Sequence, residues 1–165
     1  MMAKNKSFFI ILMRILALGA MVSAIVVMVT SHQSATVLNL TFTAKYTNDP
    51  VFKYFVVAEA IAGGYSLLVL IFFSKQSKLW RLIIILDVVI TAVLVSSISA
   101  ALAIAYVGKK GNSHAGWLPI CSQVPKFCDQ VTGSLVSGFA AAIIYLLLLL
   151  SSLHAVLTPD IAHSP

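Results

Sequence analysis

Four long apolar segments dominate the sequence and limit what it can fold into. They cover residues 8–30, 51–73, 82–107 and 131–153. A helix of about 18 or more apolar residues crosses the hydrocarbon core of a bilayer, which is about 30 Å thick. The segments are continuous rather than alternating, which favours helices over the short strands of a transmembrane barrel. The sequence therefore predicts an all-α membrane protein, built as a bundle of four transmembrane helices.

The balance of residue types argues against other classes of protein. Charged residues make up 10% of the chain and apolar residues 60%, whereas a soluble domain carries about 25% charged residues. The net charge is +6, but the basic residues are scattered at segment ends and in loops, as membrane-flanking anchors are. We therefore expect the lipid bilayer, and no nucleic acid, among the partners. The membrane domain is predicted over residues 8–157, between short tails at residues 1–7 and 158–165.

The segment at residues 8–30 follows two lysines, as the apolar core of a signal peptide does. It is too long for such a core, contains Arg14 and lacks a clear small-residue cleavage site. We interpret it as a retained anchor. Four spans then put both termini on one side of the membrane and the loops at residues 31–50 and 108–130 on the other.

Two features of these loops indicate the orientation. Lysine and arginine are balanced five against five between the two sides, although three of them crowd into residues 74–81. Asn39 begins an Asn-X-Thr sequon, a candidate N-glycosylation site that requires a lumenal loop. The only cysteines, Cys121 and Cys128, share the other large loop, and a disulfide is favoured outside the cytosol. Both features predict cytoplasmic termini, extracellular loops and a short disulfide in the second outer loop.

Two opposite charges lie inside the predicted spans at matched depth. Arg14 and Asp87 each lie roughly 9 Å along spans that run in the same direction. An isolated Arg or Asp near the bilayer centre costs at least about 2.5 kcal/mol. We expect an Arg14–Asp87 ion pair that joins the first and third helices. The alternatives are an Arg14 side chain that extends to the cytoplasmic head groups, and a role in proton or ion passage.

Glu59 is a third charged residue within a span, and its role is open. Lys53 lies six positions away, too far around the helix to be its partner. Glu59 either faces a polar interior, carries a proton or contacts another subunit. A single acid without a string of polar groups is weak evidence for a transport path.

Small residues recur at four-residue spacing in all four spans. Such stripes let helix backbones approach closely, which drives helix association in lipid. We expect most stripes to pack within the bundle, and some to serve contacts between subunits. The stripes are Gly19 and Ser23; Ala60 and Gly64; Ser97, Ala101 and Ala105; and Ser134, Gly138 and Ala142.

The outer loop with the cysteines also holds Trp117 and Phe127, which predict a contact surface or packing at the membrane interface. One histidine beside two cysteines is weak evidence for zinc. No histidine lies deep in a span, which argues against a haem held by paired histidines. The sequence contains no nucleophile–base constellation, phosphate-binding glycine loop or metal motif. It therefore predicts no catalytic site, no cofactor and no metal.

The chain resembles the Casparian strip membrane domain protein family, the CASP-like proteins of plants, which are related to MARVEL-type tetraspans. The resemblance covers nearly the whole chain. The stretch from residue 106 to residue 133 carries it most specifically. The residues that carry it are Arg14, Asp87, the segment 52–61 followed by Gly64-Tyr65, Gly111-Asn112-Ser113, Trp117, Ile120-Cys121, Phe127-Cys128 and Gly133-Ser134.

The resemblance implies a plasma-membrane protein that forms homodimers, heterodimers or larger arrays with related CASP-like proteins. Other membrane proteins or cell-wall proteins are further expected partners. The founding members form an immobile platform that guides local cell-wall modification. The loop at residues 31–50 lacks their long Phe-rich signature, so the chain is more similar to the broader CASP-like group, subfamily 1. We expect a non-enzymatic scaffold that organises a membrane domain; the alternative is a channel, a transporter or a regulatory subunit of one.

Overall fold

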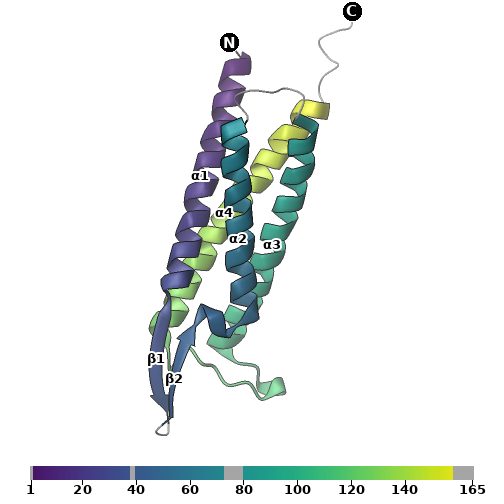
Figure 1. Ribbon diagram of the computed structural model, residues 1–165. Coiled ribbons are helices and arrows are strands. Elements are labelled where there is room, and N and C mark those ends of the chain that lie inside the picture. Colours follow the sequence, from purple (N-terminus) through teal and green to yellow (C-terminus); the bar gives the residue numbers. More distant parts are fainter. Residues whose placement is uncertain (1, 38–39, 73–79, 158–165) are drawn as a thin grey trace, which may run out of the picture.

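Four long helices make up most of the protein (Figure 1). The computed structural model describes residues 2–37, 40–72 and 80–157. The helices are α1 (Met2–Thr30), α2 (Pro50–Phe72), α3 (Trp80–Lys110) and α4 (Pro125–Leu157). All four are long and apolar enough to cross a membrane. This confirms the predicted all-α fold of four spanning helices.

The helices form a ring in which each one has two main neighbours. α1 packs against α2 and α4, and α3 packs against the same two helices. α1 and α3 therefore occupy opposite corners of the bundle, and so do α2 and α4. In Figure 1, α1 begins and α4 ends at one end of the bundle, and two strands lie at the other. We call these the termini end and the hairpin end.

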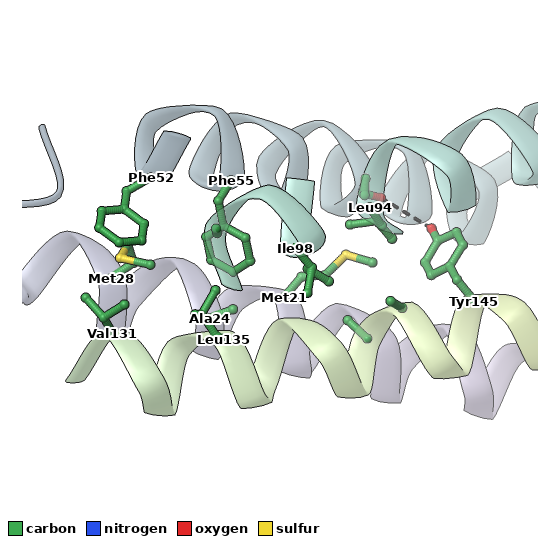
Figure 2. Packing of buried hydrophobic residues seen from close by; sticks show 14 of the residues in the cluster. Met21, Ala24, Met28, Phe52, Phe55, Leu94, Ile98, Val131, Leu135 and Tyr145 are labelled. Atoms are coloured by element: carbon green, nitrogen blue, oxygen red, sulfur yellow. Dashed lines mark hydrogen bonds between the residues drawn. The ribbon is translucent and has the colours of Figure 1, made fainter. Parts of the chain in front are cut away.

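Apolar side chains line the interior of the bundle and also cover its outside. Met21, Phe55 and Leu94 are fully buried in the core (Figure 2). Equally large side chains, such as those of Ile15 and Ile85, are exposed on the outward faces. Helices that are apolar on every side suit a core on one face and lipid on the other.

A β-hairpin occupies the loop between α1 and α2, for which no secondary structure was predicted from the sequence. β1 (His32–Val37) pairs antiparallel with β2 (Leu40–Lys45), and His32 lies opposite Lys45. Threonine alternates with apolar residues at the start of β2, and β1 ends in Thr36 and Val37, a signal for this hairpin that is present in the sequence. A short 3₁₀ turn (Tyr46–Asn48) follows. Oδ1 of Asp49 then accepts the backbone N–H of Val51 at 2.8 Å, which caps α2.

Two helices, α1 and α4, begin well before the predicted spans. α1 already begins at Met2, although residues 1–7 were predicted to form a tail. α4 begins at Pro125 rather than near residue 131, so the last six residues of the predicted loop are helical. Hydropathy marks only the part of a helix that lies in lipid, and proline at the first helical position starts a helix readily. Cys128 consequently lies on the first turns of α4.

The predicted disulfide between Cys121 and Cys128 is present, with their Cα atoms 5.7 Å apart. It ties the start of α4 to the loop that follows α3. The same loop turns sharply at Gly111, whose φ is +72°. A Cβ on this residue would lie 2.7 Å from the carbonyl oxygen of Trp117, so the turn requires glycine.

Candidate functional site: polar links inside the bundle

Arg14 and Asp87 meet in the interior of the bundle, as the matched depths predict. Both side chains are buried. Nη2 of Arg14 donates to Oδ1 of Asp87 at 2.9 Å and to Oδ2 at 2.7 Å. The pair crosses the bundle from α1 to α3, which occupy opposite corners. It therefore fixes one diagonal of the ring, a link that contacts between neighbouring helices do not provide.

Tyr65 of α2 adds a third member to this cluster. Its hydroxyl lies 2.8 Å from Oδ1 of Asp87 and donates to it, with the carbonyl oxygen of Ile83 as a second acceptor at 3.1 Å. The guanidinium carbon of Arg14 lies 5.7 Å from the centre of the Tyr65 ring, within reach of a cation–π interaction. No site role was predicted for Tyr65 from the sequence. The available signal was a tyrosine within a span, because a buried hydroxyl needs a partner.

The other diagonal, from α2 to α4, has its own polar link. The hydroxyls of Ser66 and Tyr145 form a hydrogen bond, and the Tyr145 hydroxyl also lies 3.4 Å from the carbonyl oxygen of Ala62. Figure 2 shows Tyr145 pointing into the core toward this carbonyl. Both residues are buried, and neither was singled out from the sequence.

Glu59 lies on the same diagonal and has no polar partner. The residue is fully buried on α2, and neither carboxyl oxygen forms a hydrogen bond or ion pair with any described residue. Gly138 of α4 provides the space that it occupies. A Cβ at position 138 would lie 2.8 Å from Oε1 of Glu59 and 2.8 Å from the ring of Phe55. The described residues therefore offer Glu59 no hydrogen-bonding partner, and its full burial leaves no exposed part of the side chain for a contact with another subunit.

The small-residue stripes divide into inward and outward sets. Ser97 and Ala101 of α3 are buried, and so are the three stripe residues of α4, where Ser134 donates to the carbonyl oxygen of Ala24 at 2.6 Å. The pairs on α1 and α2 are exposed instead. They are Gly19 with Ser23, and Ala60 with Gly64. No atom outside the helix backbone lies within 4 Å of a Cβ placed on either glycine.

Of the two residues expected to form a contact surface on the outer loop, Trp117 is exposed and Phe127 is buried. Trp117 is 58% exposed, but Phe127 is 6% exposed, so the prediction that Phe127 forms part of an outer surface is wrong. Phe127 packs edge-on against Phe52, with ring centres 6.4 Å apart. Its backbone N–H donates to Oε1 of Gln33 at 3.0 Å, which ties α4 to the hairpin. The helix that begins at Pro125 turns this ring inward.

Some of the predicted features fall on residues that the structure does not describe. Asn39, the candidate glycosylation site, lies outside the described residues, as do residues 73–79 of the basic loop and the tail at residues 158–165. Among the described residues, no group of three His, Cys, Asp or Glu side chains could hold a metal ion.

Four apolar helices with paired charges inside define an integral membrane protein of the four-span class. The sequence model of the Casparian strip membrane protein domain matches residues 3–144. The chain therefore belongs to the family of Casparian strip membrane domain proteins and CASP-like proteins. Its relatives place it beside one branch of that family, the CASP-like 1C proteins.

Three curated relatives show how far the similarity extends. CASP-like protein 1C3 of Populus trichocarpa is 65% identical over 99% of this chain and 100% of its own length. CASP-like protein 1C2 of Ricinus communis is 62% identical over the full length of both chains. CASP-like protein 1C1 of Arabidopsis thaliana is 56% identical over 90% of each chain. No solved structure matches this chain.

Proposed function

We propose that this protein is a non-enzymatic plasma-membrane tetraspan that associates with itself and with related CASP-like proteins. The resulting assembly would organise a membrane domain or hold partner proteins, including cell-wall proteins, in one place. Local cell-wall modification is the process that such an assembly would serve. The termini lie in the cytoplasm in this proposal, and the hairpin and the disulfide loop face the outside.

The outward small residues are the observation that carries the proposal. Gly19 and Ser23 on α1, and Ala60 and Gly64 on α2, are exposed, and a Cβ placed on either glycine would meet nothing within 4 Å outside its own helix. Small residues at four-residue spacing let a second helix approach the backbone closely, where dispersion contacts replace the lost hydrophobic driving force. The corresponding stripes on α3 and α4 are used inside the bundle, so these two pairs are free for contacts between subunits.

The test combines lateral mobility with proximity between copies. Fluorescence recovery after photobleaching on the tagged protein, at native expression in its own plasma membrane, should show little recovery within confined patches. Energy transfer between two differently tagged copies should fall severalfold when Gly19→Leu and Gly64→Leu are combined. Ala140→Leu is the matched control, because Ala140 is also exposed but has Val136 and Ile144, not small residues, at four-residue spacing.

Two results would contradict the proposal. One is fast, complete recovery over a uniform membrane, which would indicate small mobile complexes. The other is energy transfer that is equally strong in the double glycine variant, the Ala140→Leu control and the unmodified protein. The second result would remove the outward stripes as the contact between subunits, even if recovery remained slow.

The rival function is a channel, a transporter or a subunit that regulates one, and Glu59 favours it. A buried acid without a protein partner is costly in a membrane and is often functional. The purified protein in liposomes decides between the two. Selective flux that disappears in Glu59→Gln would support the rival, whereas no flux above that of empty liposomes supports the scaffold. Gln has nearly the shape of protonated Glu, so the Gly138 space accepts it.

A further inference from the structure

A pocket of about 510 Å³ lies at the hairpin end of the bundle. β2, the start of α2, the end of α3 and the start of α4 form its walls, and both disulfide cysteines line it. The pocket has no role in the proposed function or in the polar links described above. None of the sequence features considered above pointed to it, because its lining comes from four separate segments of the chain.

The inner lining of the pocket is apolar. Phe52 and Phe127 are buried there, and so are Val124 and Val131, while Ile104 is half-buried. These residues lie at or beside the hairpin-end limits of three candidate spans, which begin at Pro50 and Pro125 and end at Lys110. The pocket therefore lies at the hairpin end of the candidate spans, where we expect the lipid head groups of one leaflet.

Charges of both signs line the same pocket. Lys45 of β2 and Lys109 of α3 contribute two ammonium groups, and Asp129 of α4 contributes a carboxylate. Within the described part of the chain, none of these three side chains forms a hydrogen bond or a salt bridge. Asp49 also lines the pocket, but its carboxylate already caps α2 through the N–H of Val51. Two free cations and one free anion thus surround an apolar cavity.

We propose that this pocket binds one zwitterionic phospholipid from the leaflet at the hairpin end. The part of an acyl chain nearest the glycerol packs against Phe52, Ile104 and Val131. The phosphate lies between Lys45 and Lys109, and the ammonium group of the head lies at Asp129. A molecule with an apolar body, one negative group and one positive group matches every free feature of the lining, and it is present wherever the four helices span a bilayer.

The walls of the pocket are held in place before any ligand arrives. The Cys121–Cys128 disulfide fixes one side, and the Asp49 cap fixes the start of α2 on another. A site that is already formed avoids the entropy cost of ordering its own loops on binding. We therefore expect a lipid retained longer than those that merely surround the helices.

The experiment uses the full chain in lipid nanodiscs. The probe is a phosphatidylcholine with a photoactivatable diazirine near the glycerol end of one chain, and cross-links are mapped by peptide mass spectrometry. Cross-links should concentrate on pocket residues of α3 and α4. Ala105→Leu, which fills the pocket, should reduce them severalfold. Ala103→Leu on the exposed face of the same helix should leave them unchanged.

The head-group contacts are tested with surface variants that keep the fold. Lys45→Gln combined with Lys109→Gln should lower pocket labelling severalfold, whereas Lys53→Gln with Lys110→Gln removes equal charge outside the pocket and should not. Asp129→Asn should lower labelling by phosphatidylcholine relative to a phosphatidylglycerol probe, which lacks the ammonium group. Competition by unlabelled diacylglycerol, which has no phosphate, should be weaker than competition by phosphatidylcholine.

Several results would overturn the inference. Pocket peptides labelled no more than the exposed helix faces would mean that surrounding lipid alone reacts. Diacylglycerol that competes as well as phosphatidylcholine would remove the phosphate contact. An Asp129→Asn variant that labels like the unmodified protein with both probes would remove the ammonium contact. Cross-links between two copies of the chain at the pocket would mean that protein, not lipid, fills it.

Discussion

Arg14 and Asp87 each lower the cost of burying the other's charge, although Nε and Nη1 of Arg14 have no hydrogen-bond partner among the described residues. The Tyr65 hydroxyl also stabilises the Asp87 carboxylate by donating a hydrogen bond to it. The Thr91 hydroxyl donates to the backbone carbonyl oxygen of Asp87 at 2.6 Å. Removing one partner of a buried pair leaves an uncompensated charge, which costs far more than the pair itself contributes. The cluster is therefore sensitive to single substitutions and more tolerant of coordinated ones.

A single substitution in this pair should be severe. Arg14→Met or Asp87→Leu should each lower the free energy of unfolding by about 3–5 kcal/mol, because one charge remains buried without a partner. The double variant Arg14→Met with Asp87→Leu should be more stable than either single variant. Unfolding in mixed detergent micelles with increasing dodecyl sulfate measures all three. Strictly additive losses would show that the two residues do not depend on each other.

Gly138 is needed for the space that Glu59 and Phe55 occupy. Gly138→Ala should destabilise the bundle by about 1–3 kcal/mol, the usual cost of overpacking a core, because its Cβ would lie 2.8 Å from both side chains. Gly133→Ala on the same helix is the matched control, since a Cβ there meets nothing within 4 Å. A thermal-shift assay measures the prediction: the melting temperature should fall in Gly138→Ala and not in Gly133→Ala. Equal shifts would contradict the close approach of α2 and α4.

The hairpin end depends on the way in which short elements are tied to long ones. The disulfide joins the start of α4 to the loop after α3, and Gln33 of β1 accepts the N–H of Phe127 near the same place. Asp49 links the hairpin to α2 in a similar way, through its cap on Val51. These links hold the walls of the pocket, although none lies among the core residues of the bundle.

Loss of the disulfide should weaken this end locally. Cys121→Ser with Cys128→Ser should lower stability by roughly 2.5 kcal/mol in the chain-entropy model for so short a loop. Hydrogen exchange should rise in residues 111–128 and remain unchanged near Arg14 and Asp87. Exchange that rises equally across all four helices would show that the disulfide supports the entire bundle instead. Reduction of the unmodified protein serves as an independent check.

The whole molecule has a termini end, with the start of α1 and the end of α4, and a hairpin end, with the hairpin and the disulfide. The structure fixes this arrangement, and the orientation adopted on insertion decides which end faces the cytoplasm. Sequon and cysteine positions led to the proposal that the termini face inward. A scaffold that presents the hairpin end to the cell wall requires that orientation.

The orientation can be measured directly. A self-labelling tag at the N-terminus should react with a membrane-impermeant dye only after the plasma membrane is permeabilised. The same tag inserted at the hairpin tip should react in intact cells. Labelling of the N-terminal tag in intact cells would reverse the orientation and assign the lipid pocket to the cytoplasmic leaflet.

Whether Asn39 carries an N-linked glycan is a separate question. A loss of apparent mass on glycosidase treatment would show that it does.

The sequence by itself determined the number of spans, the disulfide and the pairing of Arg14 with Asp87. The length of an apolar segment identifies a span without knowledge of the other helices. The high cost of charge in lipid favours pairing two opposite charges that lie at the same depth. The tertiary structure decided the rest. Which small residues face inward, why Gly138 must be glycine and how the pocket forms all depend on the rotation of helices that are apolar on every face. Such helices carry no amphipathic pattern from which that rotation could be read.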